Sequence, residues 1–225
     1  MVPLALAPVL AIALGVAQPA STAAPGAGAR GEEIDRVLAL VRSSASAEPR
    51  VITLTRVAGE TRIALVGRGA MRAATEPLDA AALTAGLEWL VDQLLLIDDA
   101  TRLQLFDADG GEGEEEVAAF RARFPRPADY TAFLRRWDIT DDDVVAALRR
   151  SARVQRYLDS RVSHAAQVSE AEVTAWLEGH AADVGGRDRE LARRRLADER
   201  VAAEVRNVLR DLRARAEIRV LQRTD

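Results

Sequence analysis

Apolar residues at three- and four-residue spacing indicate that most of this chain is helical. The strongest pattern covers residues 78–106, where leucine and valine recur between Leu83 and Ile97 and form one broad apolar face. The same periodicity, broken by glycine, proline and acidic turns, continues to the end of the chain. It predicts five further helices, over residues 114–124, 129–137, 141–161, 170–179 and 188–215.

Short β-branched runs near the amino terminus predict a small sheet. Residues 51–55 and 62–66 are expected to be strands, with Gly59 as the turn signal between them. Residues 34–41 have the composition of a strand or of a short helix, and the pattern leaves both open. After the last helix, residues 216–221 are expected to be extended.

Two helix starts carry the signature of a capping box. In this motif the side chains of a hydroxyl residue and of an acid three residues later each accept a hydrogen bond from the other residue's backbone amide. Thr140 and Asp143 have this spacing, and so do Ser169 and Glu172. Acidic residues are also favourable in the first turn of a helix. Capping therefore accounts for the acidic run 141–143, and we assign it no catalytic role.

The order of these elements resembles the SurA-like periplasmic chaperones, or parvulin-type foldases. Residues 168–173, Val-Ser-Glu-Ala-Glu-Val, are similar to the family's V-S-x-x-E-(V/I) motif, and residues 216–221 resemble its closing A-x-I-x-(V/I)-L strand. Residues 90–96 and 148–162 resemble two further family helices. In the family an isomerase domain follows the V-S-x-x-E motif, but here it would have to fit between His180 and Arg187. The resemblance is therefore to the chaperone core alone.

The resemblance implies an α+β, mostly α-helical module, in which the closing strand pairs with the amino-terminal strand. Residues 30–225 are then one chaperone domain with about six helices. The implied function is ATP-independent holding of unfolded exported polypeptides, without isomerase activity, catalytic residues or cofactor. No phosphate-binding loop of the Walker type is present to support an ATP-driven cycle.

Two other functions stay open beside this one. The first is a dedicated adaptor subunit that serves one partner in an envelope or secretion complex. The second is an enzyme whose site carries no recognisable motif, for which a deep polar pocket with clustered carboxylates would be the sign. The sequence identifies neither the client nor the oligomeric state.

The amino terminus predicts export to the periplasm or beyond. Residues 2–16 are apolar and are followed by a stretch rich in small residues, as in a secretory signal, although no Lys or Arg precedes them. Residues 1–29 are therefore interpreted as a signal peptide and an Ala/Pro-rich spacer, with removal between Ala17 and Ala29. An uncleaved anchor is the alternative, but this apolar run is short for a membrane span. After removal of this signal peptide, we expect the protein to have no membrane span.

Composition argues against several kinds of site. The chain has no cysteine, which excludes disulfides and thiolate metal sites. Its net charge is −4 and its carboxy-terminal arginines alternate with acids, so nucleic acid is not an expected partner. The acidic run 107–116 departs from a calcium-binding loop at Gly111, Glu112 and Ala118, so no metal is expected there. The two histidines, His164 and His180, are expected to be solvated helix ends.

Aromatic residues make up only 4% of the chain and gather in the central helical region, where most should be core. A chaperone also needs an exposed apolar concavity that accepts many sequences. The candidate peptide-binding surface lies beside Pro125 and Pro127. It comprises Phe124, Tyr130, Phe133 and Trp137.

Overall fold

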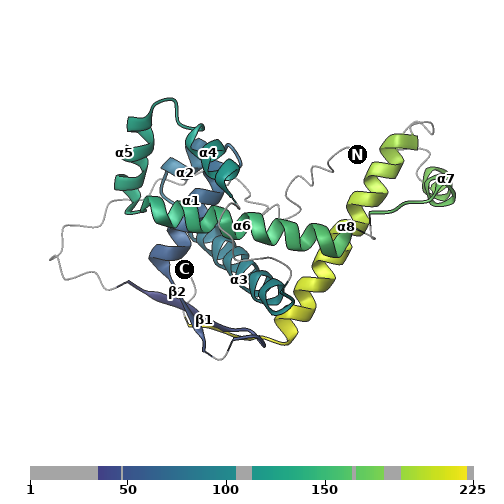
Figure 1. Cartoon of the computed structure of the whole chain (residues 1–225), viewed down its shortest axis with the longest axis horizontal. Helices are drawn as coiled ribbons and strands as arrows, with labels where there is room; N and C mark the ends of the chain where they lie inside the picture. Colours follow the sequence, from purple (N-terminus) through teal and green to yellow (C-terminus); the bar gives the residue numbers. More distant parts are fainter. Residues whose placement is uncertain (1–34, 47, 105–112, 164–165, 180–188, 222–225) are drawn as a thin grey trace.

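Three strands and eight helices make up the part of the chain that the computed structural model describes, residues 35–46, 48–104, 113–163, 166–179 and 189–221 (Figure 1). The strands are β1 (Val37–Arg42), β2 (Arg50–Thr53) and β3 (Glu217–Val220). The helices are α1 (Leu54–Gly67), α2 (Met71–Thr75), α3 (Ala80–Arg102), α4 (Glu114–Arg121), α5 (Pro127–Trp137), α6 (Asp141–Val162), α7 (Glu170–Gly179) and α8 (Arg189–Ala214). The predicted signal peptide and spacer, 1–29, lie outside these residues.

The two ends of the described chain meet in one antiparallel sheet with the order β2–β1–β3. Leu40 lies opposite Val51 of β2 and opposite Arg219 of β3. Residues 37–42 are thus a strand, which settles the choice that the sequence left open. The pairing of the closing strand with an amino-terminal strand and the α+β, mostly helical class are both confirmed.

The prediction of a strand over 62–66 is wrong, because this segment is the second half of α1. Thr53 caps the helix by accepting from the backbone amide of Arg56, and Gly59 continues it instead of turning the chain. Helix α1 is buried on several sides, so its apolar residues show no clear helical stripe. Packing overrides the β preference of Ile63 and Val66. With α2, which was also not predicted, the described helices number eight rather than six.

Helix α3 is the centre of the main core, where it packs against α1, α6 and α8 (Figure 1). It is the one described helix that is long and apolar enough to cross a membrane, a property that core helices share. Its buried Asp99 accepts a 2.6 Å hydrogen bond from the hydroxyl group of Tyr157 on α6. The sheet covers the same core through Leu38, Val41 and Ile52.

Two smaller apolar clusters lie outside the main core. One joins α1 and α2 to α4, α5 and the start of α6; we call α4 and α5 together the aromatic lobe. The other joins α7 to the first half of α8, around Val173, Leu177 and Ala192. The second half of α8 belongs to the main core, so α8 carries α7 away from the body as an arm (Figure 1). The predicted helix limits agree with the structure within a few residues. Helix α5 begins slightly earlier than predicted, at Pro127, which occupies the first turn.

Candidate peptide-binding surface

The aromatic lobe is held together by rings that meet at their edges. Phe124 lies 5.4 Å from Tyr130 and 5.4 Å from Phe133, and Phe120 lies 5.8 Å from Phe124, measured between ring centroids. Tilted and edge-to-face pairs at these distances are favourable beyond their apolar burial. The lobe is therefore a firm platform rather than a loose set of side chains.

Trp137, at the end of α5, lies against a buried arginine. The guanidinium of Arg62 is 3.4 Å from the centre of the Trp137 ring and donates to the carbonyl oxygens of Ala74 and Glu76, both at 2.9 Å. Burial, with the nearby charge of Arg136, lowers the pKa of Arg62 to about 10. Arg62 thus ties α1, the end of α2 and the end of α5 together.

A hollow of about 290 Å³ opens between α2 and α5 beside these rings. Its wall is mostly apolar, with Asp129 and Arg136 as charged members. Phe124 and Phe133 form its floor, since they are 8% and 4% exposed, while Ala132 is exposed. The apolar lining residues used below are Met71, Phe124, Pro125, Ala132, Phe133 and Trp137.

Three of the four predicted surface residues, Phe124, Phe133 and Trp137, line this hollow, and Tyr130 does not. The hydroxyl group of Tyr130 donates to Asp141, which also accepts two bonds from Arg121 at 2.7 and 2.9 Å. Burial and the bond to Asp141 raise the pKa of Tyr130 to about 12. Tyr130 packs against Phe124 of the floor and links α5 to α6.

Sequence reasoning missed the side of the hollow that α2 supplies through Met71 and Thr75. Helix α2 has five residues, too few for a periodic signal. Pro125, by contrast, was already part of the predicted segment.

A second apolar hollow, of about 210 Å³, lies between α1, α3, α6 and α8. Its lining includes Ile63 and Gly67 of α1, Trp89 of α3, and Val154 and Leu158 of α6. An apolar cavity of this size can accept one bulky apolar group.

A polar cleft of about 430 Å³ lies between the start of α1 and the first half of α6. Three of its four acids have structural partners: Glu60 forms an ion pair with Arg150, Asp143 closes the cap of α6, and Asp35 accepts from the backbone amide of Thr55. The fourth acid, Asp138, is exposed at the end of α5. Among the described residues no group of three or more potential ligands could hold a metal ion. His164, His180 and residues 107–112 lie outside the described residues. We assign no reaction to this cleft.

Comparison with models of protein families, with curated proteins and with solved structures gives no match. The function therefore has to be argued from the residues themselves.

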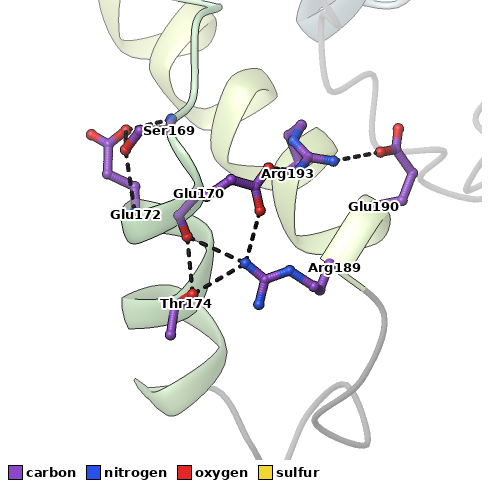
Figure 2. A network of polar contacts seen from close by, with 7 residues as sticks. All are labelled: Ser169, Glu170, Glu172, Thr174, Arg189, Glu190 and Arg193. Carbon is purple, nitrogen blue, oxygen red and sulfur yellow. Dashed lines mark hydrogen bonds and ion pairs between the residues drawn. The ribbon is translucent and has the colours of Figure 1, made fainter.

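The motif Val168–Val173 attaches α7 to α8, as Figure 2 shows. Ser169 and Glu172 form the predicted capping box, with Ser169 donating from its amide to Glu172 at 2.8 Å. Glu170 accepts from Arg189 at 2.8 Å and also pairs with Arg193. The acids of this motif thus cap α7 and, through these ion pairs, fix it to α8.

The attachment of α7 to α8 is expected to depend on pH through Glu172, which pairs with Arg200. Its bonds to Arg200 and Ser169 lower its pKa to about 2, from an ordinary value of 4.5. A carboxyl whose pKa is lowered by folding stabilises above the ordinary value, and this contribution is lost as the pH falls toward the lowered one. The wild type should therefore be more stable than Glu172→Gln at pH 7, and the difference should shrink between about pH 4.5 and about pH 2.

The measurement is urea denaturation of both proteins across this range, followed by circular dichroism. Other acids with lowered pKa, such as Asp141, titrate in both proteins and cancel in the difference. A difference that stayed constant with pH would contradict the assignment.

Proposed function

We propose that this protein is an ATP-independent holdase for unfolded exported polypeptides, and that the hollow of the aromatic lobe receives their apolar side chains. The observation that carries the proposal is the convergence of Phe124, Phe133 and Trp137 on one solvent-open, mostly apolar hollow. The resemblance of residues 168–173 and 216–221 to motifs of the SurA-like chaperones supports the same function. The segment between α7 and α8 is too short for the isomerase domain that the family carries at this place, so proline isomerisation is not proposed.

The chemistry of the hollow suits a binder of low specificity. Rings and a methionine offer contact area to many side chains, because a thioether adapts its shape and dispersion forces have no direction. Arg136 and Asp129, the latter already paired with Arg126 at 2.7 Å, add polar groups beside the apolar floor. Client segments with a bulky apolar residue flanked by polar groups fit this arrangement.

The test is suppression of the aggregation of a thermally unfolding client, followed by light scattering without ATP. Ala132→Glu places a charge in the hollow without removing a core ring, and it should require a several-fold higher ratio of protein to client for the same protection. Ala119→Glu makes the same change at an exposed position of α4 that is not among the lining residues, and it should protect like the wild type.

Circular dichroism establishes that both variants are folded. Equal protection by both would contradict the role of the hollow. A folded wild type that protects no general client would instead favour an adaptor for a single partner.

A further inference from the structure

Strand β3 uses one edge to pair with β1, and no strand of the described residues pairs with its other edge. It is the last strand in the order β2–β1–β3. Val220 and the following Leu221 are 51% and 52% exposed, the largest values among the exposed large apolar side chains of the described residues. An open edge with apolar side chains readily accepts another strand.

The register shows which backbone groups of β3 face outward. The amide of Leu221 donates to the carbonyl oxygen of Leu38 at 2.8 Å, so Leu221 faces β1. Residues alternate along an antiparallel ladder, so Arg219 and Glu217 face β1 as well. Ile218 and Val220 therefore direct their N–H and C=O groups away from the sheet.

The charges of β3 are complementary to a second, antiparallel copy of β3. If Ile218 lies opposite Ile218 of the other copy, then Glu217 lies opposite Arg219, and Arg219 opposite Glu217. Ile218 then exchanges both of its outward hydrogen bonds. The two charge pairs fall at the closer, non-hydrogen-bonded positions, with Cα atoms about 4.5 Å apart. Opposite charges at such positions stabilise a pair of strands, and like charges destabilise it.

We propose that two copies of this chain associate through β3 and form a continuous six-stranded antiparallel sheet. The occupant is a second copy rather than an arbitrary client strand, because the alternation of Glu217 and Arg219 matches its own reverse. The interface is isologous, as in most homodimers. The four-residue strand makes it small, so association should be weak and should depend on concentration. The sheet lies at the end of the body opposite α4 and α5, so the hollow of the aromatic lobe stays accessible (Figure 1).

Sedimentation velocity of the full chain over rising concentration tests this proposal. The wild type should show a monomer–dimer equilibrium. Glu217→Arg alone and Arg219→Glu alone should each weaken it by at least about tenfold, because like charges then face each other at both positions. An equal mixture of these two variants should recover the dimer, since every charge again meets its opposite. Misfolding of either variant could not produce this recovery.

Two further variants complete the test. Val220→Pro removes an outward amide without removing a bond to β1, and it should weaken the dimer. Arg72→Glu makes the same charge change as Arg219→Glu at a highly exposed position on α2 and should leave the dimer unchanged. A wild type that is monomeric at about 500 µM would overturn the proposal. A dimer that persists in Glu217→Arg, Arg219→Glu and Val220→Pro would overturn the proposal as well. So would an equal mixture of the two charge variants that stays monomeric.

Discussion

Removing the carboxylate of Glu60 should destabilise the fold by about 3–5 kcal/mol, because it leaves a buried arginine charge without its partner. Glu60 on α1 pairs with Arg150 on α6, and the two side chains are only 11% and 13% exposed. Burial lowers the pKa of Arg150, which shows the cost of its charge at this place. Arg56 reaches Glu60 from a more exposed position, at 3.6 Å.

Glu60→Leu and Arg150→Met should therefore each be strongly destabilising, whereas the double variant should lie within about 1 kcal/mol of the wild type. Urea denaturation of the four proteins gives the coupling between the two residues directly. Arg72→Met breaks the exposed pair with Glu76 and should leave the free energy of unfolding nearly unchanged. A small effect of Glu60→Leu alone would mean that water or Arg56 compensates Arg150.

The sequence predicts best those features that depend on neighbouring residues. The capping boxes at Thr140 and Ser169 are formed as expected, because every group in them lies within three residues. The long apolar face of α3 is predicted correctly as well, since its period repeats over six turns. The order of strands at the two chain ends came instead from the family resemblance.

The features that the sequence misses depend on packing between distant segments. Residues 62–66 look like a strand because they contain the β-branched residues Ile63 and Val66, and nothing local shows that α1 is buried on several sides. The candidate site was predicted in part. Aromatic residues beside prolines led to Phe133 and Trp137, but not to Met71, which reaches the hollow from a segment more than fifty residues away. Tyr130 has the right residue type, yet its hydroxyl is bound to Asp141.

Gly86 is expected to be sensitive to substitution, because α1 and α3 are in close contact there. A Cβ atom at Gly86 would lie 2.0 Å from the hydroxyl oxygen of Thr61 and 3.2 Å from its Cβ atom. Alanine normally stabilises the interior of a helix relative to glycine by about 1 kcal/mol. Here the clash should reverse the sign, and Gly86→Ala should destabilise the protein by about 1–3 kcal/mol.

A second substitution separates this clash from any general effect on α3. The hydroxyl group of Thr61 is buried and has no hydrogen-bond partner among the described residues, so Thr61→Ala alone should cost little. Combined with Gly86→Ala it should recover most of the lost stability, because the atom in the way is gone. Gly67→Ala is the matched control, since a Cβ atom there meets nothing within 4 Å. Thermal and urea unfolding of these variants measure the effect. A Gly86→Ala protein as stable as the Gly67→Ala protein would mean that α1 and α3 lie farther apart, and that the second hollow, which both helices line, is wider than described.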